Sequence, residues 1–278
     1  FSFASEVLGY DMWQLIQQGA QEDINLTQRT QPILLTCSVA IWRLWNQKQG
    51  AKPSQMAGHS LGEWSALVCA NVIDFADGLK MVEARGKFMQ QAVPVGQGAM
   101  AAIIGLDDKA ILAACTEAST LGVVDAVNFN APGQVVIAGA NDAVERAMDI
   151  CKAAGAKRAL PLPVSAPFHT SLMKPAADNL AEMVNTITFR APEVPVMHNV
   201  HAKNEHDPQA IKALMLEQIY SPVKWVDCVE QLKDSGVSAL VECGPGKVLS
   251  GLAKRIDREL IAISTESVTD FDAALTTI

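Results

Sequence analysis

The sequence lacks the features that would place the protein in a membrane or outside the cell. No apolar run reaches the roughly 18 residues that a membrane-spanning helix needs. Residues 1–10 have neither the basic start nor the apolar middle of a secretory signal. Hydrophobic residues make up 49% of the chain and charged residues 19%, which is typical of a soluble globular protein. We therefore expect a cytoplasmic protein that does not span a membrane.

Paired cysteines and an excess of basic residues are also missing. The six cysteines include no C-x-x-C pair and most lie among apolar residues, so we predict reduced packing residues. Lys and Arg number 22 against 30 Asp and Glu, a formal charge of −8, which argues against binding to nucleic acid. Residues 152–174 are a local exception, with four basic side chains and no acidic one. This basic segment could contact an acidic protein partner.

No group of residues in the sequence has metal-ligand spacing. The polar stretch 201–207 carries two histidines, but their spacing matches no helical metal pair, and we predict a solvated loop there. We expect neither a metal nor a redox cofactor.

The order of predicted elements divides the chain into two parts. There is no internal repeat, low-complexity stretch or Gly/Ser linker, and 278 residues suit one α/β unit that carries an insertion. The middle third predicts, in order, a strand at 98–106, a helix at 107–119, strands at 123–128 and 134–138, a helix at 141–154 and a strand at 158–164. The order β-α-β-β-α-β is that of the ferredoxin-like fold. We predict a small ferredoxin-like subdomain at residues 96–166.

The flanking segments alternate longer helices with short apolar strands. We expect helices at 31–47 and 76–91 and strands at 55–57, 194–198 and 239–242. Such alternation predicts one parallel sheet covered by helices, an α/β-hydrolase-like core. Residues 1–95 and 167–278 would therefore form a large catalytic subdomain.

A serine follows the first of these strands in a motif that is typical of nucleophiles. Residues 58–62, Gly-His-Ser-Leu-Gly, fit G-x-S-x-G between a short strand and a helix. The glycines permit a sharp turn that presents the Ser60 hydroxyl at the helix N-terminus, where the Leu61 amide can donate to an oxyanion. The alternative is a simple turn with a helix-capping serine.

A serine nucleophile needs a base, and the chain has five histidines. His59 would point away if Ser60 is at the apex of the turn, and His198 ends a predicted strand. His169 lies in a proline-fixed loop where the two parts of the chain rejoin, and it is our candidate base. The alternative is a histidine that is hydrogen-bonded in the seam between the parts.

An arginine lies on an apolar helix face. Arg85 shares this face with Gly78, Val82 and Met89, at spacings of three and four residues. A guanidinium in apolar surroundings needs an anion. The sequence leaves two partners open, an internal carboxylate or the free carboxylate of a substrate held by two parallel hydrogen bonds.

With these motifs in order, the chain resembles the malonyl-CoA:acyl carrier protein transacylase family. The resemblance runs over nearly the whole chain and rests on the segments 30–32, 58–63, 82–86, 127–134, 163–169 and 242–246. It implies that Ser60 carries the acyl group, that His169 is general base and then acid, and that Arg85 binds the malonyl carboxylate. It also implies that the backbone carbonyl of Gln218 orients His169. The remaining implied pocket residues are Gln31, Met89, Asn128 and Asn130.

The resemblance implies a ping-pong transfer of malonyl from malonyl-CoA to the phosphopantetheine thiol of an acyl carrier protein, in support of fatty-acid synthesis. Malonyl-CoA and the carrier would be the partners of a monomeric enzyme without a cofactor. Phe168, just before His169, is similar to the residue of the malonyl-selecting members.

The sequence departs from the family in one respect. The family has a Gly-Gln-Gly-Ser-Gln-like loop close to its N-terminus, whose glutamine amide is the second oxyanion donor. This sequence does not contain that loop, and we expect it upstream of Phe1. Two other functions stay open here. One is a thioesterase or esterase with the same residues, since hydrolysis needs only a well-placed water. The other is a non-catalytic carrier-binding protein.

Overall fold

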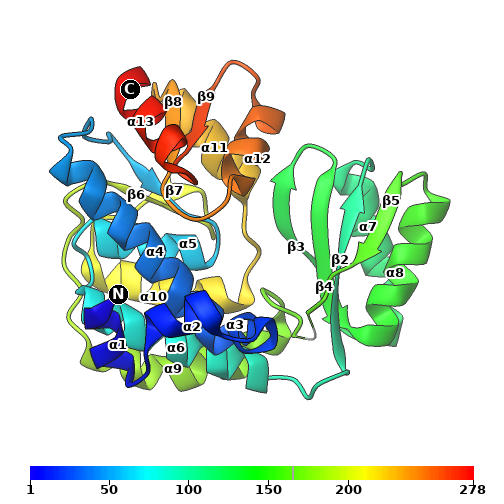
Figure 1. Cartoon of the computed structure of the whole chain (residues 1–278). Helices are drawn as coiled ribbons and strands as arrows, with labels where there is room; N and C mark the ends of the chain where they lie inside the picture. Colours follow the sequence, from blue (N-terminus) through cyan, green and yellow to red (C-terminus); the bar gives the residue numbers. More distant parts are fainter. Residues whose placement is uncertain (165) are drawn as a thin grey trace.

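The computed structural model describes residues 1–164 and 166–278, and Ser165, within the predicted segment 96–166, lies outside the described residues. Elements from both ends of the chain build its larger part, and a four-stranded sheet with two helices stands beside it (Figure 1). The larger part begins with helices α1 (Ser2–Leu8), α2 (Met12–Gln18), α3 (Gln21–Asn25) and α4 (Thr27–Gln47), strand β1 (Met56–Ala57), and helices α5 (Leu61–Cys69) and α6 (Phe75–Gln91).

The chain returns to the larger part through α9 (Lys174–Thr186). Strands β6 (Val196–His198) and β7 (Lys203–Asn204) follow, then helices α10 (Pro208–Glu217) and α11 (Trp225–Asp234), strand β8 (Ala239–Glu242), helix α12 (Val248–Ile256), strand β9 (Ile261–Ser264) and helix α13 (Val268–Thr277). Among the described residues, 3₁₀ turns lie at Ser119–Leu121, Ser171–Met173 and Gln218–Tyr220. Helices α4, α5, α6 and α9 enclose the main apolar core, which includes Leu35, Trp64, Leu67, Met81 and Leu180.

The strands of the larger part do not form the single parallel sheet that the sequence predicts. β1 pairs with β6 in parallel, β7 pairs with β6 antiparallel, and β8 and β9 form a separate parallel pair. β1 and β8 belong to different sheets, and residues of both strands line an apolar cavity of about 510 Å³. The fold is therefore mixed α/β with several sheets. The stretch predicted as a solvated loop is mostly exposed but includes β7.

The smaller part follows the predicted order of elements. It consists of β2 (Gly98–Ile104), α7 (Asp108–Ala118), β3 (Val124–Ala131), β4 (Gln134–Ala140), α8 (Asn141–Ala153) and β5 (Arg158–Pro161). The strands lie in the order β3-β4-β2-β5, and every neighbouring pair is antiparallel. Because side chains alternate along a strand, Ala101 and Ile103 of β2 face the core under α7 and α8, while Met100 packs on the opposite face near Phe168.

Strand β3 joins the two parts. The Phe129 amide donates to the Val223 carbonyl at 3.0 Å, and the Val223 amide donates to the Val127 carbonyl at 2.8 Å. Ala131, at the end of β3, belongs to the same apolar cluster as Trp225. These contacts fix the smaller part against the segment that follows the Gln218–Tyr220 turn.

The described part of the chain contains neither a candidate membrane span nor a candidate metal cluster. None of the helices in residues 1–164 and 166–278 is long and apolar enough to cross a membrane. Over the same residues, no three His, Cys, Asp or Glu side chains gather in a way that could hold a metal ion.

Candidate active site

Ser60 occupies a strained turn between β1 and α5. Its backbone has φ 52° and ψ −105°, a conformation that non-glycine residues rarely adopt. A Cβ at Gly58 would overlap the backbone of Gly62 and Glu63, so the turn can close only with glycine there. Leu61 is the first residue of α5, and its amide therefore lies at the helix N-terminus beside Ser60.

The Ser60 hydroxyl is not used to cap helix α5. Ser60 and Glu63 have the S-x-x-E spacing of a capping box, in which each side chain would bind the other residue's amide. Here no side-chain cap forms. The Ser60 amide donates instead to Asn199 Oδ1 at 2.8 Å, and Asn199 Nδ2 donates to the Gly58 carbonyl at 2.8 Å. Asn199 therefore holds the backbone of the turn, and the Ser60 hydroxyl is available for contacts other than a helix cap.

The structure brings His169 and Gln218 to Ser60. Ser60 Oγ lies 2.8 Å from His169 Nε2, and His169 Nδ1 lies 2.8 Å from the Gln218 carbonyl oxygen. Because a carbonyl can only accept, Nδ1 carries the ring proton and Nε2 accepts from the Ser60 hydroxyl. Burial, and then the charge of Arg85, lower the pKa of His169 to about 3. The imidazole is therefore neutral at pH 7 and can accept a proton from Ser60.

Arg85 reaches the same hydroxyl from helix α6. The side chain is buried, at 2% exposure, and its Nη2 donates to Ser60 Oγ at 3.0 Å and to Gln218 Oε1 at 3.2 Å. Its Nη1 donates to Gln31 Oε1 at 2.7 Å, and its Nε has no hydrogen-bond partner among the described residues. Burial lowers the pKa of the guanidinium to about 10, an effect that the charge of Glu63 opposes. Arg85 is thus a buried cation whose hydrogen-bond partners are neutral oxygens.

Comparison with known proteins places this geometry in a family. The sequence model of the acyl transferase domain matches residues 2–267. The chain belongs to the acyl transferase family. Among curated relatives, the malonyl CoA-acyl carrier protein transacylase of Escherichia coli K12 is 59% identical over 275 residues, 99% of this chain and 89% of the relative. The Bacillus subtilis protein of the same name is 42% identical over 279 residues, 100% of this chain and 88% of the relative.

Solved structures of proteins with similar names also match this chain. An acyl carrier protein S-malonyltransferase from Vibrio cholerae superposes with a TM-score of 0.96 at 59% identity, over 98% of this chain and 89% of that chain. A second structure contains a type II PKS acyl-carrier protein in complex with its malonyl-transacylase, and it matches with a TM-score of 0.98 at 55% identity, over 100% of this chain and 90% of that chain.

The buried carboxylate of Glu63 lies next to the Ser60 turn of this acyl transferase. Glu63 is fully buried, and its oxygens contact His198, Asn199 and Gln218. Neither Glu63 nor Asn199 was predicted as a site residue from the sequence, and only the backbone carbonyl of Gln218 was. The S-x-x-E spacing and the polar residues at the end of β6 were the available signals for them.

In this acyl transferase, the other predicted pocket residues have no described hydrogen bond to the Ser60 hydroxyl. Asn130 Oδ1 is 2.8 Å from His59 Nε2, so it contacts the turn through His59. Asn128 is buried at the point where β3 bridges to Val223, and Met89 lies in the core one turn after Arg85 on α6. Neither residue has a hydrogen bond to the group around Ser60 among the described contacts.

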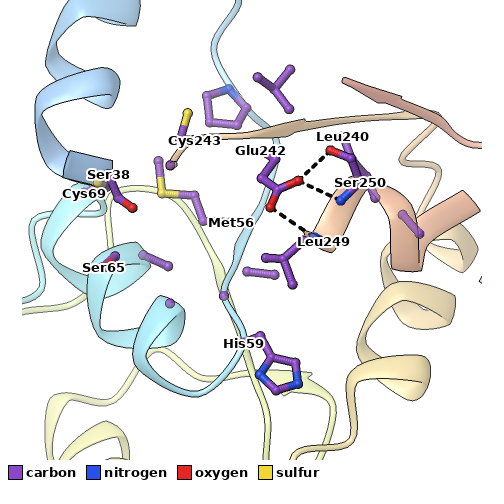
Figure 2. A pocket seen from close by; sticks show the side chains of 18 of the residues that line it. Ser38, Met56, His59, Ser65, Cys69, Leu240, Glu242, Cys243, Leu249 and Ser250 are labelled. Carbon is purple, nitrogen blue, oxygen red and sulfur yellow. Dashed lines mark hydrogen bonds between the residues drawn. The ribbon is translucent and has the colours of Figure 1, made fainter. Parts of the chain in front are cut away.

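The apolar cavity lies beside the turn and is a separate feature of this acyl transferase. His59, Leu61 and Gly62 line it, whereas Ser60, His169 and Arg85 do not. Figure 2 shows the Glu242 carboxylate within it, accepting from the Leu249 amide at 3.0 Å and from the amide and hydroxyl of Ser250, each at 2.7 Å. Glu242 thereby caps the start of α12.

Proposed function

We propose that this acyl transferase moves a malonyl group from malonyl-CoA to the phosphopantetheine thiol of an acyl carrier protein, and so supplies fatty-acid synthesis. The observation that carries the proposal is the hydroxyl of Ser60, 2.8 Å from a neutral histidine and 3.0 Å from a buried guanidinium. The names of the relatives and the carrier complex of a 55% identical neighbour support the choice of malonyl-CoA and carrier protein.

In the first half-reaction, Ser60 Oγ attacks the thioester carbonyl and its proton passes to His169 Nε2. The carbonyl oxygen, which becomes negatively charged, accepts a hydrogen bond from the Leu61 amide at the N-terminus of α5. The carbon–sulfur bond then breaks, and the CoA thiolate leaves with the proton from His169. A malonyl ester of Ser60 remains.

In the second half-reaction, the carrier thiol gives its proton to His169 and its sulfur attacks the ester carbonyl. The Ser60–carbonyl bond breaks, and Ser60 takes the proton back from His169. The Gln218 carbonyl holds His169 through Nδ1 in both steps, in the place where many serine enzymes have a carboxylate. No resident cofactor takes part in this scheme.

Arg85 is proposed to bind the malonyl carboxylate through its two terminal nitrogens. Gln31, Met89, Asn128 and Asn130 complete the proposed acyl pocket. A bound carboxylate also changes the base, because the charge of Arg85 helps to lower the pKa of His169. Neutralising that charge raises the basicity of His169 when a substrate with a carboxylate is present. The substrate therefore strengthens the base that activates Ser60.

We propose the following organisation for the enzyme. Residues 96–166 form a ferredoxin-like subdomain, supported by the β3-β4-β2-β5 strand order and by a separate apolar core. Residues 1–95 and 167–278 form a large α/β catalytic part that contains β1, the Ser60 turn and α5. We propose a monomer that works in the cytoplasm.

The test is intact-mass analysis after mixing with malonyl-CoA and then with a carrier protein that bears phosphopantetheine. The proposal expects a malonyl adduct on the wild type that the carrier removes, and no adduct on Ser60→Ala. An adduct that disappears as fast without a thiol would identify a hydrolase. A wild type that never acquires the adduct would refute the proposed function and favour a carrier-binding protein.

A further inference from the structure

The Glu63 carboxylate meets only groups that can donate hydrogen bonds to it. Its Oε2 accepts from the Asn199 amide at 3.1 Å and from Gln218 Nε2 at 2.6 Å, and its Oε1 lies 2.7 Å from His198 Nδ1. None of its described contacts is an acceptor that would require a proton on the carboxyl group. Burying such an anion is costly unless it is fully hydrogen-bonded. The Glu63 carboxylate has three hydrogen-bond partners here, and it fixes the positions of the groups that donate to it.

The Gln218 side chain links this anion to the buried cation. Its Nε2 donates to Glu63 Oε2 and, at 2.9 Å, to the Ser60 carbonyl. Its Oε1 accepts from Arg85 Nη2 at 3.2 Å and from Trp64 Nε1 at 3.3 Å. A reversed amide would turn its NH₂ group toward the guanidinium and its oxygen toward the carboxylate, which neither partner tolerates. The two charges therefore fix one orientation of the amide.

We propose that Glu63 is a positioning residue for malonyl recognition. By holding Gln218 Nε2, Glu63 keeps Gln218 Oε1 directed at Arg85 and fixes the guanidinium for the substrate carboxylate. The inference rests on the proposed function. Helix capping does not explain Glu63, because Asn199 holds the Ser60 amide and no side-chain cap forms at α5.

Substitution of Glu63 separates charge from shape. Gln keeps the size of the side chain but offers one acceptor oxygen, and Gln218 can then rotate its amide. Malonyl kcat/KM should fall by about tenfold to a hundredfold, the range of one charge-assisted hydrogen bond. Acetyl-CoA has no carboxylate for Arg85 to hold, so its kcat/KM should fall less. Glu63→Asp keeps the charge and should retain more malonyl selectivity than Glu63→Gln, whereas a packing role would favour the isosteric Gln.

The experiment measures the ratio of malonyl to acetyl kcat/KM for Ser60 acylation by intact mass. Lower stability or a smaller folded fraction reduces both rates equally and leaves this ratio unchanged. The matched control is Glu242→Gln, since Glu242 also accepts three hydrogen bonds but caps α12, and its ratio should equal that of the wild type. Gln218→Met should lower the ratio as Glu63→Gln does. If Glu63 acts through Gln218, the double variant should be no worse than the more affected single variant.

An unchanged ratio in Glu63→Gln, on a wild type that is malonylated, would overturn the inference and leave the proposed function standing. A wild type without a malonyl adduct would overturn both. If Glu63→Gln does not fold, Gln218→Met decides, and an equal loss of malonyl and acetyl kcat/KM in Gln218→Met would refute the positioning role.

Discussion

Replacing Arg85 by alanine should change which substrate the enzyme prefers. Malonyl-CoA differs from acetyl-CoA by one carboxylate, and Arg85 is the buried cation next to Ser60. Truncating one partner of a buried, hydrogen-bonded charge pair costs about 2–5 kcal/mol. At about 1.4 kcal/mol per tenfold, malonyl kcat/KM should fall roughly thirtyfold to several-thousandfold. Acetyl transfer has no carboxylate to leave unpaired, so it should fall little.

The structure refines this expectation. Removal of the guanidinium also leaves Gln31 Oε1 without the Arg85 donor and Gln218 Oε1 with Trp64 Nε1 alone, a loss that affects both substrates alike. The measured quantity is therefore the ratio of malonyl to acetyl kcat/KM with one carrier protein. Lys87→Ala, at an exposed position on the same helix, is the control, and circular dichroism verifies folding. Equal decline with both substrates, or unfolding of Arg85→Ala, would make Arg85 a structural residue and refute the reasoning.

Three further predictions concern the proposed base, nucleophile and docking surface. Ser60→Ala should lower transfer by about a million-fold, and a malonyl adduct on this variant would move the nucleophile elsewhere. The pKa of His169 is about 3 in the folded chain and about 6.5 in the unfolded chain. Between these two pH values, the His169 ring is protonated in the unfolded state and neutral in the folded state. As the pH falls below 6.5, the free energy of unfolding of the wild type, measured with urea, should decrease by up to about 1.4 kcal/mol per pH unit more than that of His169→Asn. Parallel plots of this free energy against pH for the two proteins would contradict the prediction. Reversing the exposed Lys157 and Arg158 to Glu should raise the KM for the acidic carrier at low salt but not the rate of malonylation by malonyl-CoA, and equal loss in both half-reactions would count against docking.

Local sequence patterns predicted the local structure well. The alternation in β2 and the two helical periods around β3 and β4 gave the element order of the smaller part, because each pattern depends on neighbours a few residues away. The G-x-S-x-G segment likewise predicted a strand, a turn and a helix around Ser60. Strand pairing in the larger part was predicted wrongly, since the cavity between β1 and β8 depends on how distant segments pack.

The candidate site shows the same division. Ser60, His169 and Arg85 each had a local signal, and the structure brings them within hydrogen-bond distance of one another through Ser60 Oγ. Glu63 and Gln218 are separated by 155 residues in the chain, and their contact has no local signature. The S-x-x-E spacing even suggests a helix cap that does not form. Such networks depend on tertiary packing, which single-sequence patterns do not contain.

Asn199 holds Ser60 in a backbone conformation that serves the proposed reaction and lowers the stability of the fold. The Ser60 side chain caps nothing, while its positive φ strains the backbone. Glycine adopts this conformation without strain, so Ser60→Gly gains about 1 kcal/mol from the backbone and loses the hydrogen bonds of the hydroxyl with His169 and Arg85. The backbone of the turn would favour glycine at residue 60, whereas the proposed chemistry requires the hydroxyl of serine. A screen of variants for thermal tolerance should therefore include a transfer assay, because substitutions that relax this turn can remove the nucleophile.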